Sequence, residues 1–307
     1  MTVIFSDPLF ARHETPPGHP ERAERMAAVD RALARVELSG LEQRTAEPAP
    51  YDAIARAHPS SYIEKICAAA PRSGSIALDP DTHMGPHSLD VARLASGQAM
   101  AAVDAVLSGE ASNAFVASRP PGHHAERTRA MGFCLFNHIA VAARYAQTIH
   151  GIDRVAIVDF DVHHGNGTQD IFEADGSVLY ASTHQWPLYP GTGAGSERGV
   201  GNIVNVPVGA GMTGAQYRPL FTETITRAVA KFRPELVLLS AGFDGHADDP
   251  LAGLRLVEDD FVWITRQMMD VAAEFSGGRL VSILEGGYDL GALERSTAAH
   301  VATLAGL

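Results

Sequence analysis

The stretch RVAIVDFDVHHGNG, residues 154–167, joins a short apolar run to a run of polar residues. Its first part, 154–160, is apolar at consecutive positions rather than at alternate ones. Strands of a parallel sheet have this pattern, because helices bury both of their faces. The stretch therefore predicts a central strand that ends in a polar loop.

Similar apolar runs recur along the chain and alternate with longer segments of helical periodicity. The other predicted strands are 114–117, 177–183, 202–208, 236–241 and 280–284. The predicted helices are 88–107, with Ser88 as N-cap, 137–150, 214–232, 258–275 and 290–305. This alternation predicts an α/β fold with a mostly parallel central sheet flanked by helices. The length, 307 residues, suits a single domain over 1–307.

Composition narrows the class of protein. Hydrophobic residues make up 46% and charged residues 20% of the chain, as in an ordinary globular protein. The net charge of −12 argues against binding to nucleic acid, and it suits either cationic substrates or simple solubility. With two cysteines, Cys67 and Cys134, a disulfide scaffold or a cysteine-rich zinc site is excluded. We see no signal peptide and no membrane-spanning run, and we expect a cytoplasmic protein.

Residues that could carry chemistry follow four of the predicted strands. They are His123 and His124 after 114–117, Asp161 and His163 after 154–160, Asp244 after 236–241, and Tyr288 after 280–284. Parallel sheets bind ligands at the carboxyl ends of their strands. We therefore expect an active site at that edge of the sheet.

Three of these residues predict a metal site. In an extended chain Asp159, Asp161 and His163 would share one face, and two carboxylates so close repel one another unless a cation lies between them. With Asp244 as a third ligand beside Asp161 and His163, a position stays open for water, as in catalytic zinc sites. The alternative is that these are helix-capping and loop residues.

The remaining residues suit acid–base chemistry. His123 and His124 follow a stiff Pro-Pro-Gly turn, and a neutral histidine beside a metal site can accept and return a proton. Tyr288 follows two glycines, and its hydroxyl could donate to a developing oxyanion. Each of these residues taken alone would more often be a packing residue.

Taken together, the motifs resemble the zinc-dependent histone deacetylase and acetylpolyamine amidohydrolase superfamily, whose fold is the arginase/deacetylase-like one. The similarity is greatest to bacterial class II-like enzymes. The matching stretches are HPERAER at 19–25, RPPGHHA at 119–125, GFCLFN at 132–137, DFDVHHGNGTQDIF at 159–172, YPGTG at 189–193, SAGFD at 240–244 and EGGY at 285–288. They occur in family order and span nearly the whole chain.

The resemblance implies one Zn²⁺ per chain, bound by Asp161, His163 and Asp244. It also implies the catalytic residues: His124 as the general base and acid, His123 as its partner with Asp159 orienting it, and Tyr288 as the residue that polarises the substrate carbonyl. Where class I enzymes have an aspartate, this chain has Asn166. A neutral amide stabilises protonated His124 less than a carboxylate would.

The resemblance further implies a tunnel for an acyl-lysine side chain. Phe133 and Tyr189 are its aromatic walls, and Gly132 lines the same channel. A related polyamine deacetylase has a glutamate at the position of Leu251. The leucine therefore favours acetyl-lysine, in a peptide or protein, or a simple acylated amine over an acetylated polyamine.

Monovalent cations are also implied, with K⁺ as a structural ion. The matching positions are Asp159, Asp161, His163, Ser182 and Thr183, and a second, weaker match involves Phe172, Asp175, Val178 and Asn202. Arg25 resembles a residue of an internal channel below the zinc.

Two rival functions stay open on the sequence. An arginase-like enzyme with two manganese ions would need another ligand where Gly165 stands, although His246 lies close to Asp244 in sequence. A non-catalytic acyl-lysine binder would not need His123, His124 and Tyr288. The sequence leaves a homo-oligomer open.

Overall fold

The computed structural model describes residues 1–35 and 37–307. Within them, eight parallel strands form one sheet in the order β2-β1-β5-β10-β9-β6-β7-β8. The strands are β1 Thr2–Phe5, β2 Glu42–Arg44, β5 Asn113–Val116, β6 Val155–Asp159, β7 Val178–Gln185, β8 Ile203–Val208, β9 Leu236–Ala241 and β10 Leu280–Leu284. A separate antiparallel pair joins β3 Ile76–Ala77 to β4 His83–Met84. The predicted α/β class and mostly parallel sheet are confirmed.

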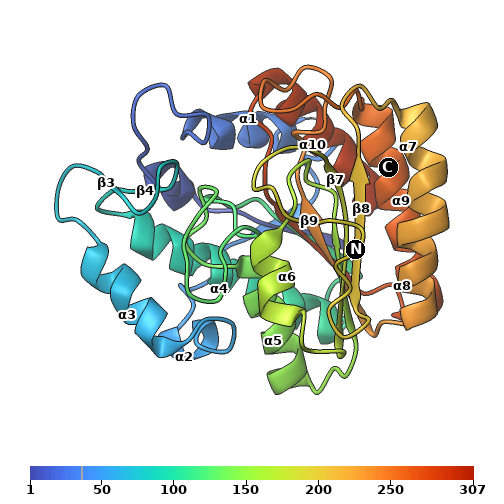
Figure 1. Cartoon of the computed structure of the whole chain (residues 1–307), viewed down its shortest axis with the longest axis horizontal. Coiled ribbons are helices and arrows are strands. Elements are labelled where there is room, and N and C mark those ends of the chain that lie inside the picture. The colour runs from blue at the N-terminus through green and yellow to red at the C-terminus, as the bar shows by residue number, and fades with distance from the viewer. Residues whose placement is uncertain (36) are drawn as a thin grey trace.

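Helices cover both faces of this sheet (Figure 1). They are α1 Glu24–Leu33, α2 Tyr51–Ile54, α3 Ser60–Ala69, α4 Ser88–Leu107, α5 His138–His150, α6 Asn166–Phe172, α7 Gly214–Phe221, α8 Arg227–Phe232, α9 Glu258–Phe275 and α10 Leu290–Ala305, with a 3₁₀ turn at Pro8–Arg12. One hydrophobic cluster packs α1 and α7 to α10 against the sheet, and a second packs α4 and α5 on the opposite face.

Strand β6 shows why consecutive positions are apolar. Val155 and Ile157 belong to the cluster with α4 and α5, whereas Ala156 and Val158 belong to the cluster with α9 and α10. Successive side chains of a strand point to opposite faces, so a strand covered on both sides buries all of them. Figure 1 shows α7, α8 and α9 on one side of the sheet and α4 and α5 on the other.

The six predicted strands and five predicted helices all lie where elements form, and most bounds agree within two residues. The segment 214–232 is the exception, because it is not one regular helix. Helix α7 passes into a π-helical segment at Thr222–Thr226 before α8 begins. Pro219 lies just before this segment, and a proline inside a helix removes one backbone hydrogen bond and displaces the next turn.

The prediction for Ser88 was wrong. The N-cap position of α4 is His87, without a side-chain cap, and Ser88 is the first helical residue. The Ser88 hydroxyl instead accepts a hydrogen bond from the backbone N–H of Gly85 at 2.8 Å and contacts His13 Nδ1 at 2.7 Å. It therefore ties the start of α4 to the N-terminal segment.

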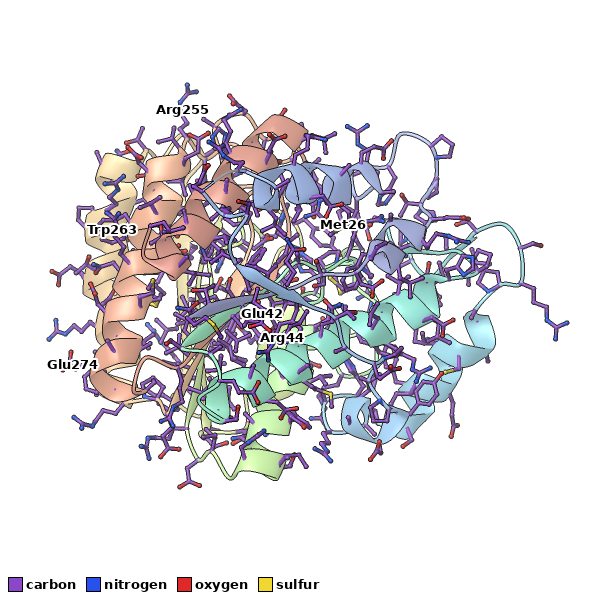
Figure 2. All side chains as sticks on the ribbon, turned by 180° about the vertical axis from the view of Figure 1, so that it is seen from behind. Met26, Glu42, Arg44, Arg255, Trp263 and Glu274 are labelled. Carbon is purple, nitrogen blue, oxygen red and sulfur yellow. The ribbon has the colours of Figure 1, made fainter. Side chains whose placement is uncertain are left out.

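The sequence patterns did not predict β1, β2 or the helices α1, α2, α3 and α6, which are all short. Strand β2 is an edge strand with charged residues, and Glu42 and Arg44 are labelled on it in Figure 2. Charged side chains at an edge discourage pairing with another chain. None of the helices within 1–35 and 37–307 combines the length and apolarity that crossing a bilayer requires.

Candidate active site

The residues singled out in the sequence follow four strands that are neighbours in the sheet. The order β5-β10-β9-β6 places the segments after these strands side by side at the carboxyl edge. His123 and His124 follow β5, Tyr288 follows β10, and Asp244 follows β9. Asp159 is the last residue of β6, and Asp161 and His163 come directly after it.

Asp161, His163 and Asp244 converge on one point. One potential ligand atom from each lies within 4.8 Å of the others, and all three side chains are buried. Nδ1 of His163 lies 3.1 Å from Asp161 Oδ1 and 3.0 Å from Asp244 Oδ2. A nitrogen and two carboxylate oxygens in this arrangement can hold a divalent cation such as zinc.

The chain is not extended after Asp159, which corrects one expectation. Residues 161–163 form a bend, in which the backbone N–H of Asp161 donates to Asp159 Oδ1 and that of His163 donates to Asp161 Oδ1. The expected alternation persists nevertheless, because Phe160 and Val162 pack into the hydrophobic core. Asp159, Asp161 and His163 are thereby turned toward His123 and Asp244.

Electrostatics within this cluster are strongly perturbed. Burial and the neighbouring carboxylate of Asp161 raise the pKa of Asp244 to about 7. Burial by itself would lower the pKa of His163, but hydrogen bonds and charge from Asp161 and Asp244 raise this pKa to about 10. Two buried carboxylates thus share positive charge on one imidazole. A metal cation at the same point would satisfy both carboxylates and leave His163 neutral.

Two glycines make the cluster sterically possible. A Cβ on Gly286 would collide with the carboxylates of Asp161 and Asp244, and a Cβ on Gly242 would collide with Asp161. The backbone N–H of Gly286 donates to Asp161 Oδ2 at 2.8 Å. The glycines of the EGGY and SAGFD motifs therefore let the backbone approach the cluster directly.

The hydrogen bonds of His124 define its tautomer. Asn166 Nδ2 donates to Glu126 Oε1 at 2.7 Å, so Asn166 Oδ1 is the atom left to accept from His124 Nδ1, at 2.8 Å. His124 Nε2 then carries the lone pair. Burial, together with positive charge on His123 and His163, lowers the pKa of His124 well below its ordinary value. His124 is therefore a neutral imidazole that can accept a proton at Nε2.

His123 has a different environment. Its Nδ1 lies 3.0 Å from Asp159 Oδ2, which also accepts from the Tyr180 hydroxyl at 3.0 Å. Burial opposes protonation of His123, but the carboxylates of Asp159 and Asp161 raise its pKa well above the ordinary value. The rings of His123 and His124 are 4.0 Å apart between centroids. The sequence did not reveal Tyr180, which lies inside β7 and reads there as a core residue.

Tyr288 is held by its backbone and by a buried arginine. Its N–H donates to Asp249 Oδ2 at 2.6 Å, and Asp249 Oδ1 accepts from Leu251 N–H at 3.0 Å. Arg25 donates to the carbonyls of Gly287 and Glu285 and lies 5.0 Å from the centre of the Tyr288 ring. Burial raises the pKa of Tyr288 well above its ordinary value, although Arg25 opposes this, so its hydroxyl keeps its proton.

A cavity of about 220 Å³ leads to this cluster. Its lining residues are Asp81, His124, Gly132, Phe133, His163, Leu188, Tyr189, Leu251 and Tyr288. The tunnel residues expected from the sequence are thus brought together, and Asp81 and Leu188 are additions. Aromatic rings pack edge-on along it, with 5.1 Å between the centroids of His124 and Tyr189 and 5.8 Å between those of Phe133 and Tyr288.

The loop at 79–82 supports one wall of this cavity. Asp81 Oδ1 accepts from Gly132 N–H at 3.2 Å, and Thr82 Oγ1 accepts from Phe133 N–H at 3.0 Å. A Cβ on Gly132 would collide with the His124 ring, and Phe133 adopts φ of 69°. No local pattern near Asp81 indicates a pocket, because its partners are about fifty residues away in sequence.

The positions expected for monovalent cations lie beside the site. Asp159 and Ser182 are paired across β6 and β7. The hydroxyl of Ser182 contacts His184 Nδ1, and that of Thr183 contacts the Tyr217 hydroxyl. At the weaker set, the carbonyl oxygens of Phe172, Asp175 and Val178 lie 2.8, 2.9 and 2.8 Å from Asn202 Nδ2. Those carbonyls therefore converge on the amide nitrogen of Asn202.

Among the residues that the structure describes, the features of an arginase-like second metal site are not assembled. At Gly165, a Cβ would collide with Asp159 and Tyr180, so no ligand side chain fits there. His246 is not a member of the candidate metal group, and its ring stacks on Phe261 with 6.5 Å between ring centroids. Within 1–35 and 37–307, the group that could hold a metal is Asp161, His163 and Asp244.

Comparison with known proteins agrees with this geometry. Residues 19–304 match the family described as histone deacetylase domain. The histone deacetylase-like amidohydrolase of Pseudomonas aeruginosa is 42% identical over 286 residues, covering 92% of this chain and 74% of that protein. The polyamine deacetylase HDAC10 of Homo sapiens is 38% identical over 311 residues, covering 93% of this chain and 44% of that protein.

The fold agrees as well. The crystal structure of the HDA15 HD domain superposes with a TM-score of 0.94 at 35% identity, covering 99% of this chain and 89% of that one. The resemblance expected from the motifs is confirmed, as is the prediction of an enzyme that hydrolyses amide bonds. The chain belongs to the histone deacetylase domain family.

Proposed function

We propose that this chain is a zinc-dependent deacetylase that hydrolyses the amide bond of acetyl-lysine or of a related acylated amine, releasing acetate and the free amine. The observation that carries the proposal is the convergence of Asp161, His163 and Asp244 beside an aromatic-walled cavity that His163 lines. His124 and Tyr288 line that same cavity. A metal site, a base and an oxyanion donor thus share one space.

The residues present fit one zinc ion per chain. Asp161, His163 and Asp244 would hold it, and their carboxylates already compete for positive charge on His163. When bound, zinc supplies Lewis acidity, which polarises a carbonyl oxygen and makes water more acidic. Three protein ligands leave an open position, as a catalytic site requires.

The side chains around that point have complementary roles. His124 Nε2 accepts a proton from water and later returns it to the departing amine. His123, held by Asp159, keeps positive charge beside His124. The Tyr288 hydroxyl donates a hydrogen bond to the oxygen on which negative charge develops, which stabilises the transition state more than the ground state.

The cavity suits a thin alkyl chain that carries an acyl group. Phe133 and Tyr189 face its sides, and burying each CH₂ of a lysine side chain gains about 0.8 kcal/mol. Leu251 lines the cavity and offers no charge for a second ammonium group. We therefore rank acetyl-lysine above acetylated polyamines.

An acetylated polyamine is the second candidate substrate. One observation favours it: the Asp81 carboxylate lines the cavity, and Asp79 lies close enough to perturb it. A carboxylate there could pair with a second ammonium group. The relative named polyamine deacetylase gives this candidate further weight.

Further features of the proposal follow from the sequence. We expect one catalytic domain over 1–307, K⁺ as a structural ion near Asp159 and Ser182, and no nucleic-acid or membrane partner. The pairing of Asp159 with Ser182 across two strands supports the K⁺ position. Cys67 and Cys134 are unpaired, which supports a reducing, cytoplasmic location.

Metal analysis and a substrate panel test this proposal together. We expect one zinc per chain, loss of activity on chelation, and recovery when zinc is restored. Acetyl-lysine peptides should be hydrolysed with higher kcat/KM than acetylputrescine or acetylspermidine, and His124→Ala should abolish turnover. Equal activity in the wild type and His124→Ala, or full activity without metal, would contradict a zinc deacetylase.

A further inference from the structure

Glu285 is a buried carboxylate that belongs neither to the candidate metal group nor to the cavity lining. Oε2 accepts from the backbone N–H groups of Gly122 at 2.6 Å and His123 at 3.1 Å, and Oε1 accepts from the Ser240 hydroxyl at 3.0 Å. A buried carboxylate is costly unless such bonds compensate for lost water.

The two backbone donors belong to the turn that carries the acid–base pair. Glu285 Oε2 is the acceptor that the described residues provide for both N–H groups. The rest of the turn is fixed by other bonds, since the Gly122 carbonyl accepts from Ala125 and the His123 carbonyl accepts from Thr168. Glu285 Oε2 therefore accepts from the two N–H groups of the Gly122–His123 segment.

The backbone of Glu285 is held just as firmly. Its N–H donates to the Ala241 carbonyl at 2.9 Å, and its own carbonyl accepts from Arg25 at 2.5 Å. Tyr288 follows three residues later on the same loop. Because β5 and β10 are paired neighbours, Glu285 spans the gap between the loop with His124 and the loop with Tyr288.

We propose that Glu285 is a positioning residue that fixes the distance between the His124 imidazole and the Tyr288 hydroxyl by binding the Gly122–His123 backbone to the Tyr288 loop. It touches no substrate. This inference rests on the proposed function, because both groups must serve the same acyl group: His124 takes the proton of the attacking water, and Tyr288 donates to the carbonyl oxygen. A displacement of about 1 Å at such a site lowers turnover about 100-fold.

Three variants separate position from charge. Glu285→Gln keeps an oxygen for both backbone donors, and its NH₂ group can donate to the Ser240 oxygen. Glu285→Ala leaves both N–H groups without their acceptor. Ser240→Ala is the matched control, since it removes the third bond of the carboxylate and leaves the two backbone bonds in place.

Turnover is measured per zinc-loaded site, counted by titration with a tight-binding alkyl hydroxamate, so that unfolded protein does not enter the result. In Glu285→Ala we expect kcat to fall about 100-fold with KM within about threefold, because the tunnel walls are untouched. In Glu285→Gln and Ser240→Ala we expect kcat within about threefold of the wild type.

Amide hydrogen exchange at Gly122 and His123 gives a second readout, measured on metal-free protein without any turnover. We expect faster exchange at both amides in Glu285→Ala and wild-type protection in Glu285→Gln.

If these amides exchange no faster in Glu285→Ala, or if kcat per titrated site stays within threefold, the inference fails. Equal impairment of Glu285→Gln and Glu285→Ala would also overturn it, because charge and not position would then matter. A wild type that hydrolyses no acylated amine would refute the proposed function, while exchange still decides whether Glu285 holds the turn.

Discussion

Single side chains in this site owe their chemistry to their surroundings, through hydrogen bonds or through burial. His124 is a base at Nε2 because Asn166 accepts at Nδ1, and Asn166 must accept there because Glu126 holds its NH₂ group. Tyr288 stays a donor because burial raises its pKa. Residue identity alone does not determine these states.

The first residue-scale prediction concerns the Tyr288 hydroxyl. Tyr288→Phe should lower kcat/KM on an acetyl-lysine peptide by about 10²- to 10³-fold, the usual effect of losing one oxyanion donor. Tyr189→Phe is the control, since it removes a hydroxyl from the same cavity and leaves the ring that packs on His124. Steady-state kinetics check this, and similar losses in both variants would argue against an oxyanion role for Tyr288.

A second residue-scale prediction concerns Leu251, which lines the cavity. Leu251→Glu should raise kcat/KM for acetylspermidine relative to an acetyl-lysine peptide by about tenfold, because one charge-assisted hydrogen bond is worth at least 1.4 kcal/mol, or about a factor of ten. Leu251→Gln has the same shape without the charge and should change the ratio little. A competition assay with both substrates measures it; an unchanged ratio in Leu251→Glu would mean that position 251 does not meet the second ammonium group.

At the scale of elements, the starts of helices fix the catalytic loops. The loop with Tyr288 ends at the N-cap of α10, where Asp289 Oδ1 accepts from Ala292 N–H at 2.7 Å. The loop after β5 ends at the N-cap of α5, where Asn137 Oδ1 accepts from Ala140 N–H at 3.0 Å. In both cases a capping residue begins the helix directly after a catalytic segment.

Removal of one such cap should destabilise the fold by a defined amount. Asp289→Ala should lower the free energy of unfolding by about 1 kcal/mol, because the partly buried start of α10 loses its acceptor. Asp289→Asn keeps an oxygen that can accept and should lie within a few tenths of a kcal/mol of the wild type. Urea unfolding of both variants checks this, and an equal loss in the two would show that capping is not the cause.

The whole molecule contains several histidines that are buried and neutral. Burial lowers the pKa of His13 and His58 to about 4 and that of His138 and His300 to about 3. At pH values between these lowered pKa values and the ordinary histidine pKa of 6.5, the unfolded chain binds more protons than the folded one. Stability from these groups is therefore complete above pH 6.5 and is lost as the pH falls toward 4.

This predicts a lower free energy of unfolding at pH 5 than at pH 7, and a single substitution isolates one contribution. His300 is held between Thr265 and Ser282. His300→Gln should make the free energy of unfolding fall less between pH 7 and pH 5, by about 1.4 kcal/mol for each unit of the His300 pKa shift that lies in this range. Urea midpoints at both pH values for the two proteins measure this. Parallel pH dependence in wild type and variant would contradict it.

The sequence predicted those helices and strands whose pattern is visible within one segment. The strand at 154–160 was predicted because burial on both faces makes consecutive positions apolar. The helices at 258–275 and 290–305 were predicted because burial of one face repeats apolar residues at helical spacing. Short elements such as β1 and α6 carry too few residues for a period to stand out. The π-helical segment after Pro219 was missed because one proline does not indicate how the following turn adjusts.

The candidate metal-binding and catalytic residues could be predicted for the same reason. Asp161, His163, Asp244, His124 and Tyr288 stand next to strand ends and glycines, so their motifs are short and continuous. Asp81, Tyr180 and Glu285 were not recognised as site residues, because each acts through a partner far away in the chain.

By itself, the sequence determined the α/β class, the family and the residues able to bind metal and move protons, since these follow from short-range patterns and motifs. Only the tertiary structure decided that β5, β10, β9 and β6 lie side by side, that three ligands from two strand ends meet, and that Glu285 joins two catalytic loops. Strand order depends on how helices of both layers pack across the whole sheet, and that packing energy is not encoded in any one segment.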